Sequence, residues 1–170
     1  MMVRKLMLLG EMAVGKTSIA NRLAFDRFGE SYKSTIGTDI YVYDVEAQPD
    51  EKPFRFLIWD TDGSFEDAMF RSHYMRGAHA AIIVGDLTRR KTLESQLRLA
   101  QKFSEALPGR YFAAVLNKND LRDEVPMDDN WGPKGLRRPF FPVIETSAKS
   151  GHNIKRTFQD GAETIARRDR

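Results

Sequence analysis

The residues best suited to chemistry lie in the segment GEMAVGKTS, residues 10 to 18, directly after the apolar run LMLL. The segment matches the pattern G-x-x-x-x-G-K-[ST], in which a glycine-rich loop joins a buried strand to a helix. Successive backbone N–H groups in such a loop can turn inward around an anion, and the start of the helix adds partial positive charge. A chance turn is the alternative, but the order of strand, loop and helix favours a phosphate-binding loop.

The pattern gives individual residues of this loop defined roles. Lys16 can reach the β- and γ-phosphates of a nucleotide, and the hydroxyl of Thr17 can bind Mg²⁺. The residues expected to hold the phosphates are Gly10, Met12, Ala13, Val14, Gly15, Lys16, Thr17 and Ser18. The motif indicates a nucleotide without saying which one, because kinases, ATPases and GTPases share it.

Two later segments are suited to selecting the base. In NKND, residues 117–120, the carboxylate of Asp120 can accept hydrogen bonds from both N1–H and the exocyclic amine of guanine, a donor pair that adenine lacks. The stem of Lys118 can lie flat over the ring. In ETSAK, residues 145–149, the N–H of Ala148 can face guanine O6. Each segment alone is common in surface loops, but both downstream of a phosphate loop predict guanine binding. The residues concerned are Asn117, Lys118, Asp120, Ser147, Ala148 and Lys149.

Alternating strands and helices must position these loops. We predict strands at residues 3–9, 39–46, 54–59, 78–84, 111–116 and 140–144, and helices at 16–25, 92–107 and 153–168. This alternation is typical of an α/β fold with a mostly parallel sheet, in which ligands bind beyond the carboxyl ends of the strands. The second and third strands are expected to pair as a hairpin. Residues 29–37 and 47–53 are expected to be loops, and glycine and proline should leave 128–139 with at most a short or distorted helix.

The composition limits the classes of function. The 170 residues, 41% hydrophobic and 30% charged, are typical of one soluble domain, residues 1–170. A net charge of +3 is too small to indicate nucleic acid, and no aromatic-basic stripe is present. The lack of cysteine excludes disulfides, thiolate metal sites and a lipid anchor on this chain. No apolar run suits a membrane span or a signal peptide, so we expect a cytoplasmic monomer.

Five motifs together resemble the nucleotide-binding motifs of the Ras-superfamily small GTPases. They are GEMAVGKT, STIGTD, WDTDG, NKND and ETSAK, in family order and at close to family spacing over nearly the whole chain. The wording of TIGTD, WDT and RGAHAAIIVGDLT is most similar to the Rab branch. The resemblance implies a P-loop NTPase G domain that binds GTP/GDP and Mg²⁺. Its fold would be α/β, with a six-stranded, mostly parallel sheet, one antiparallel strand and about five flanking helices.

The resemblance also implies roles around the γ-phosphate. Thr35 would bind Mg²⁺ and the γ-phosphate, Asp60 would hold Mg²⁺ through water, and the Gly63 N–H would bind the γ-phosphate. Phe28 would pack edge-on against guanine, unless it is a core aromatic. The implied metal residues are Thr17, Thr35 and Asp60, and the implied catalytic residues are Lys16, Thr35, Gly63 and Ser64.

The resemblance further implies protein partners. Effector proteins would contact switch regions 29–41 and 61–76, and an exchange factor and a GTPase-activating protein would regulate the cycle. In Rab-like proteins an aromatic triad across the switches signals the nucleotide state, and the matching positions here are Ile40, Trp59 and Tyr74. Core packing is the alternative for Trp59.

Departures from the family pattern bear on hydrolysis. Ser64 replaces the usual glutamine that orients the attacking water, and its hydroxyl is too short to reach that water. Asp62 replaces a usual alanine. Its carboxylate is either repelled by the like charge of the γ-phosphate or takes the place of the missing glutamine. Met12 and Ala13 replace the glycines of Ras itself and obstruct an arginine finger, although Rab proteins tolerate such residues.

We therefore expect a molecular switch with slow intrinsic GTP hydrolysis that an activating protein can still accelerate. One alternative is a GTP-bound interaction module that does not cycle. Another is a phosphotransferase acting on a small molecule, although that leaves NKND and ETSAK unexplained. Ras and Rab proteins usually end in a tail with lipidated cysteines. The sequence ends at Arg170 without a cysteine, which favours a protein that uses no lipid over one whose tail was removed.

Overall fold

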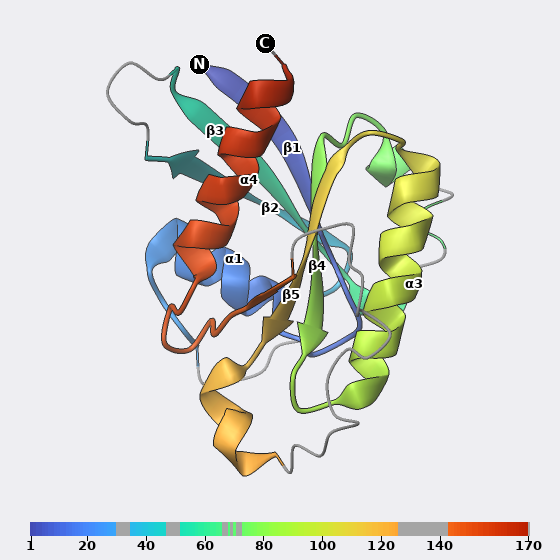
Figure 1. Ribbon diagram of the computed structural model, residues 1–170, viewed down its shortest axis with the longest axis vertical. Helices are drawn as coiled ribbons and strands as arrows, with labels where there is room; N and C mark the ends of the chain where they lie inside the picture. Colours follow the sequence, from blue (N-terminus) through green and yellow to red (C-terminus); the bar gives the residue numbers. More distant parts are fainter. Residues whose placement is uncertain are drawn as a thin grey trace.

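One six-stranded sheet organises the part of the chain that the structure describes. The structure is a computed structural model, and it describes residues 1–29, 35–46, 52–65, 68, 70, 73–125 and 143–169. The strand order is β2-β3-β1-β4-β5-β6 (Figure 1). The strands are β1 (Met2–Leu9), β2 (Thr38–Val45), β3 (Phe54–Thr61), β4 (Ala80–Asp86), β5 (Tyr111–Asn117) and β6 (Val143–Glu145). Only β2 runs antiparallel to its neighbour, so the predicted sheet is confirmed.

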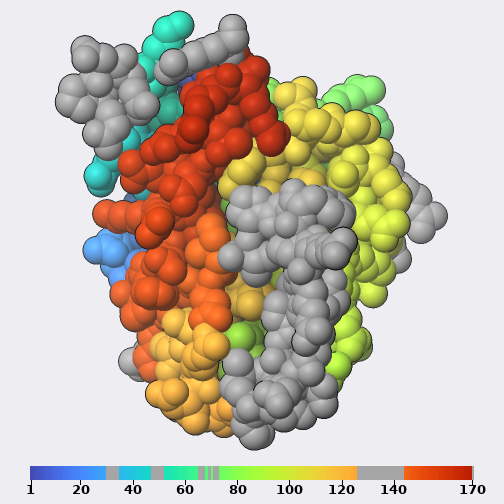
Figure 2. Space-filling view, viewed as in Figure 1, coloured from blue at the N-terminus to red at the C-terminus, as the bar shows by residue number. Residues whose placement is uncertain are grey.

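Helices cover both faces of this sheet. The α-helices within the described ranges are α1 (Lys16–Phe25), α3 (Arg90–Ala106) and α4 (Ile154–Arg168). Short 3-10 helices are η1 (Gly63–Phe65), η2 (His73–Met75) and η3 (Asn119–Glu124). Helices α1 and α4 lie on one side of the sheet and α3 on the other (Figure 1). In the space-filling view, α4 (red) and α3 (yellow-green) lie on opposite sides of the visible face (Figure 2). None of the helices in these ranges combines the length and the apolar character that crossing a bilayer requires.

The apolar run of β1 contributes to the hydrophobic cores on both faces of the sheet. Successive side chains of a strand point to opposite faces, so Leu6 and Leu8 pack in the core beneath α1 and α4. Met7 and Leu9 pack in the core beneath α3. A central strand with helices on both faces needs a continuous apolar sequence, and this need explains the run LMLL before the phosphate loop.

The predicted element boundaries differ from the observed ones chiefly at β4. The strand predicted at 78–84 instead begins at Ala80, because the N–H of Ala78 closes a turn on the carbonyl of Met75. It continues to Asp86, which pairs with Asn117 of β5. The predicted loops at 30–34 and 47–51, the segment 128–139 and the predicted strand residues 140–142 lie outside the described residues.

We expect Phe158→Ala to lower the free energy of unfolding by about 3–5 kcal/mol, because it empties a buried aromatic site. Phe158 is 1% exposed and makes edge contacts with Phe56 and Tyr43. Urea titration of the folded protein measures the loss. Phe25→Ala is the control, because Phe25 is 60% exposed, and it should cost less than about 1 kcal/mol. Equal losses in the two variants would contradict the assignment of Phe158 to the core.

Candidate nucleotide-binding site

A cavity of about 710 Å³ lies where the segments after β1, β3, β5 and β6 meet. This is the carboxyl edge of the parallel strands, where the sequence predicted the chemistry to be. The predicted site residues that line the cavity are Met12, Ala13, Gly15, Lys16, Thr17, Ser18, Phe28, Thr35, Gly63, Asn117, Lys118, Asp120, Ala148 and Lys149. Asn21, Thr61 and Leu121 also line it, and no role was expected for any of them. Asn21 lies one helical turn after Thr17, and this spacing could have placed it at the site.

Two glycines allow the loop between β1 and α1 to turn. Gly10 has φ 147° and Gly15 has φ 102°, both in the region that favours glycine. A Cβ atom at Gly10 would lie 2.3 Å from the carbonyl oxygen of Val84, and one at Gly15 would lie 2.3 Å from Asn117 Nδ2. Gly10 and the buried Val14 therefore support the loop from beneath instead of lining the cavity.

The side chain of Lys16, at the end of the loop, reaches back to the start of the loop. Its side chain is largely buried, and its Nζ donates to the carbonyls of Gly10, at 2.5 Å, and Glu11, at 2.8 Å. These bonds hold the ammonium group at the edge of the cavity. The cation is thus placed before any anion arrives, which reduces the ordering cost of binding one.

Three predicted metal residues meet beside Lys16. The hydroxyls of Thr17 and Thr35 are 2.8 Å apart, and Thr17 donates to Asp60 Oδ2 at 2.5 Å. The other carboxylate oxygen, Oδ1, is buried without a hydrogen-bond partner among the described residues. Burial raises the pKa of the Asp60 carboxyl to about 6, although the Thr17 hydroxyl and the Lys16 ammonium oppose this shift.

The base-side residues are held by the loop and by one another. Asn117 Nδ2 donates to the carbonyl of Val14 at 3.0 Å, and Lys118 Nζ donates to that of Ala13 at 2.9 Å. Asp120 Oδ1 accepts a 2.5 Å hydrogen bond from the hydroxyl of the buried Ser147, which lies behind the cavity wall. These contacts connect the two segments that were predicted to bind the base with the phosphate loop.

The N–H of Ala148 donates to Asn117 Oδ1 at 3.1 Å. Its expected contact with guanine O6 stays a prediction. Arg22, which the motifs did not indicate, donates to the carbonyls of Ala148, at 2.9 Å, and Lys149, at 2.5 Å. Helix α1 thereby fixes the position of the ETSAK segment. This contact joins residues far apart in sequence, so no local sequence pattern predicts it.

The aromatic side chains near the cavity divide between the site and the core. Phe28 lines the cavity and is 37% exposed, so the alternative that it is a core aromatic is wrong. Trp59 packs against the core beneath α3 and also contacts the ring of Tyr74, with the ring centroids 6.2 Å apart. Ile40 is paired directly with Trp59 across the β2-β3 ladder. The three positions of the expected triad are therefore neighbours, and Trp59 also packs against the core; that the triad signals the nucleotide state stays a prediction.

The two unusual residues after β3 interact with each other. Asp62 Oδ1 accepts hydrogen bonds from both the backbone N–H and the hydroxyl of Ser64, each at 2.8 Å. These bonds lower the pKa of the Asp62 carboxyl, so it is ionised at neutral pH. Asp62 lines the cavity, whereas Ser64 does not. The Ser64 hydroxyl is therefore already bound to a carboxylate within the same turn.

A phosphate-type loop between β1 and α1, with base-side segments after β5 and β6, defines the class of P-loop nucleotide-binding α/β proteins. Comparison with known proteins then identifies the family. The Ras family model matches residues 5–167. The Ras-related protein Rab-1A of Dictyostelium discoideum is 34% identical over 165 residues, which cover 96% of this chain and 81% of the relative. The chain belongs to the Ras family.

This membership settles the general activity. The protein is a small GTPase with similarity to the Rab branch. It binds guanine nucleotide, hydrolyses GTP and acts as a nucleotide-dependent switch. Proteins of this family work with effectors, exchange factors and GTPase-activating proteins. The comparisons give no support to a module that does not cycle, and the small-molecule phosphotransferase is wrong.

We expect Gly63→Ala to slow single-turnover GTP hydrolysis by at least about tenfold, because a small displacement of catalytic groups is costly. A Cβ atom at Gly63 would lie 2.4 Å from the backbone nitrogen of Met12 and 2.5 Å from the carbonyl carbon of Glu11, so the segment after β3 must move away from the loop. Gly29→Ala is the matched control, because a Cβ atom there meets nothing within 4 Å. Identical rates in the two variants would contradict this role of Gly63.

Proposed function

We propose that the cavity binds GTP and GDP together with Mg²⁺, and that intrinsic GTP hydrolysis in it is slow. The observation that carries this proposal is the meeting of Lys16, Thr17, Thr35 and Asp60 at one end of the cavity, with Ser64 bound to Asp62 instead of facing the reaction. We also propose that residues 1–170 form one G domain.

The phosphates would lie in the loop between β1 and α1. The backbone N–H groups from Met12 to Lys16 and the start of α1 supply partial positive charge. Lys16 adds a full charge at the β- and γ-phosphates, where negative charge shifts during the reaction. Ser18 and Gly15 complete the wall of this subsite.

The residues Thr17, Thr35 and Asp60 fit Mg²⁺. All three offer oxygen atoms, which Mg²⁺ prefers, and the 2.8 Å between the two hydroxyls is close to the roughly 2.9 Å between neighbouring ligands of an octahedral ion. The unpartnered Asp60 Oδ1 would accept from a water of the ion, as the family pattern implies. When bound, Mg²⁺ would neutralise charge on the β- and γ-phosphates.

The base would lie between the NKND and ETSAK segments. The hydrogen bond from Ser147 uses only one acceptor site of Asp120 Oδ1, so the two oxygens of this carboxylate would still accept the two donors of guanine. Lys118 and Phe28 would pack against the ring system. The N–H of Ala148 would have to be shared between Asn117 and guanine O6 to take its predicted part.

Hydrolysis would proceed by in-line attack of water on the γ-phosphorus. The Gly63 N–H and Lys16 stabilise charge on the γ-phosphate, and Thr35 orders the first switch around it. No side chain at position 64 orients the water, since the serine hydroxyl donates to Asp62. An activating protein that brings an arginine would raise the rate by about 10³–10⁵, and it could also bring a glutamine.

Effectors would bind across switch regions 29–41 and 61–76. Within the described part of these regions, the exposed apolar side chains include Ile36 (90%), Ile40 (54%) and Tyr74 (45%). Ile40 and Tyr74 flank Trp59, so a change in either switch would alter one continuous apolar surface. Such a surface is typical of a site for another protein.

The slow reaction is tested by changing residue 64. We expect Ser64→Gln to raise the single-turnover rate of GTP hydrolysis in Mg²⁺ by at least about tenfold, because the longer amide can orient the water. Ser64→Ala is the control and should stay within about twofold of the original rate. A large loss in Ser64→Ala would show that the serine hydroxyl acts in the reaction and would overturn this part of the proposal.

Guanine recognition is tested by Asp120→Asn. The amide keeps an acceptor for Ser147 but presents a donor where the guanine amine needs an acceptor, so GDP affinity should fall at least about 100-fold. Xanthosine diphosphate, which has a carbonyl in place of that amine, should bind the variant more tightly than it binds the original protein. Calorimetric titration measures both affinities. Unchanged GDP affinity would place the base elsewhere.

A further inference from the structure

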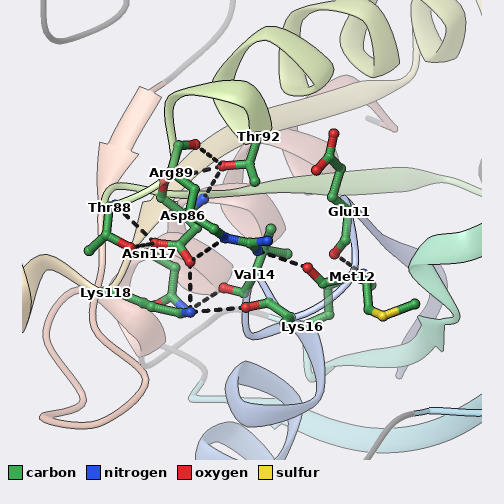
Figure 3. Close-up of polar contacts among 11 residues, drawn as sticks. Glu11, Met12, Val14, Lys16, Asp86, Thr88, Arg89, Thr92, Asn117 and Lys118 are labelled. Atoms are coloured by element: carbon green, nitrogen blue, oxygen red, sulfur yellow. Dashed lines mark hydrogen bonds and ion pairs between the residues drawn. The ribbon is translucent and has the colours of Figure 1, made fainter.

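The buried carboxylate of Asp86 is not used by the function described so far. It ends β4, and its side chain is only 1% exposed. Its Oδ2 is 2.7 Å from Lys118 Nζ and 3.0 Å from Arg89 Nε, as Figure 3 shows. Its Oδ1 accepts from the N–H of Thr88, at 2.9 Å, and from the Thr88 hydroxyl, at 2.7 Å. A buried charge is tolerated only with such partners, so the site is built around an ionised carboxylate.

The charge state of Asp86 agrees with this geometry. Burial raises the pKa of its carboxyl, but the hydrogen bonds from Lys118 and Thr88 outweigh burial, and the pKa is lowered from the ordinary value of 3.8. The backbone around it is also held firmly. The hydroxyl of Thr92 accepts from the Asp86 N–H at 2.8 Å and donates to the carbonyl of Arg89 at 2.7 Å. Asp86 therefore places a negative charge in a fixed position at the end of β4.

Both cationic side chains that bind Asp86 also donate hydrogen bonds to the phosphate loop. Arg89 Nη2 donates to the carbonyl of Met12 at 2.8 Å, and Lys118 Nζ donates to the carbonyl of Ala13 at 2.9 Å. Two consecutive carbonyls of the loop are thus held by two side chains that share one carboxylate oxygen. The Met12 side chain, 48% exposed, takes no part in these contacts.

The direction of these carbonyls decides where the loop's N–H groups point. In a planar trans peptide the C=O and the N–H of one unit point in opposite directions. Holding the Met12 carbonyl outward turns the Ala13 N–H toward the cavity, and holding the Ala13 carbonyl outward does the same for Val14. The backbone also needs this support, because Ala13 (φ 61°) and Lys118 (φ 68°) are both left-handed, a conformation that is unfavourable for a residue other than glycine.

We propose that Asp86 is a positioning residue which, through Arg89 and Lys118, orients the Met12 and Ala13 peptide units so that their N–H groups face the nucleotide's phosphates. The inference rests on the proposed function, since it places those phosphates in this loop. Because Lys118 also faces the base, one carboxylate links the base subsite to the phosphate subsite. The expected consequence is slow release of nucleotides that carry a β-phosphate.

The test compares Arg89→Met with Arg90→Met. Arg89 lies at the surface end of the network, so its loss should leave the fold intact while freeing the Met12 carbonyl. Arg90, its neighbour, forms an ion pair with the exposed Glu94 at 3.9 Å and is the matched control. Release of fluorescent GDP from the Mg²⁺-loaded protein should accelerate at least about fivefold in Arg89→Met and less than twofold in Arg90→Met. Arg89→Lys should restore part of the loss.

A second readout separates positioning from general damage. The affinity of Arg89→Met for GMP, which lacks the β-phosphate, should fall less than twofold while that for GDP falls at least fivefold. Asp86→Asn should release GDP at least tenfold faster. Adding Arg89→Met to it should change the rate little further, because both act through one network. If Asp86→Asn does not fold, the Arg89 variants decide the question alone.

The outcomes separate this inference from the proposed function. If the original protein binds GDP and Arg89→Met releases it at the original rate, the inference is overturned and the proposed function stands. Equal losses for GMP and GDP also overturn it, since they indicate damage to the base side. If the original protein binds no guanine nucleotide, the proposed function itself fails.

Discussion

The direction of the peptide units between Gly10 and Lys16 is the constraint on which the rest of the structure depends. A loop that is to hold an anion must turn its N–H groups inward, and its carbonyls must then find donors outside. The side-chain donors come from three places: Lys16 from α1, Asn117 and Lys118 from the end of β5, and Arg89 from the turn after β4. The sheet order, with β4 beside β1 and β5 beside β4, makes this convergence possible.

The same arrangement joins the base side of the cavity to its phosphate side. Asn117 binds both the phosphate loop and the ETSAK segment, and Arg22 ties that segment to α1. The ETSAK segment and the phosphate loop are thus connected through the side chain of Asn117. At the other end of the cavity, Thr17, Thr35 and Asp60 connect α1, the first switch and β3. The slow hydrolysis that we propose follows from a smaller feature, the hydrogen bond from the Ser64 hydroxyl to Asp62.

Much of this could be predicted because it is local. The spacing of Gly10, Gly15 and Lys16 indicates the loop, the period of apolar residues places α1 at its observed bounds, and the later motifs indicate the base side. The contacts that could not be predicted join residues far apart in sequence. Arg89 meets Met12 across 77 positions and Arg22 meets Ala148 across 126, so they depend on how the strands are ordered. The end of β4 was missed because its last residues pair with β5 instead of following a local pattern.

The most direct test of the account is one turnover of GTP by the unaltered protein, loaded with Mg²⁺ and observed for release of phosphate and for the nucleotide that stays bound. We expect complete conversion of one equivalent to bound GDP, at less than about one event per minute without an activating protein. GTP that stays intact and bound until the protein itself decays would contradict the account. So would conversion faster than one event per second, because a site without an oriented water could not support it.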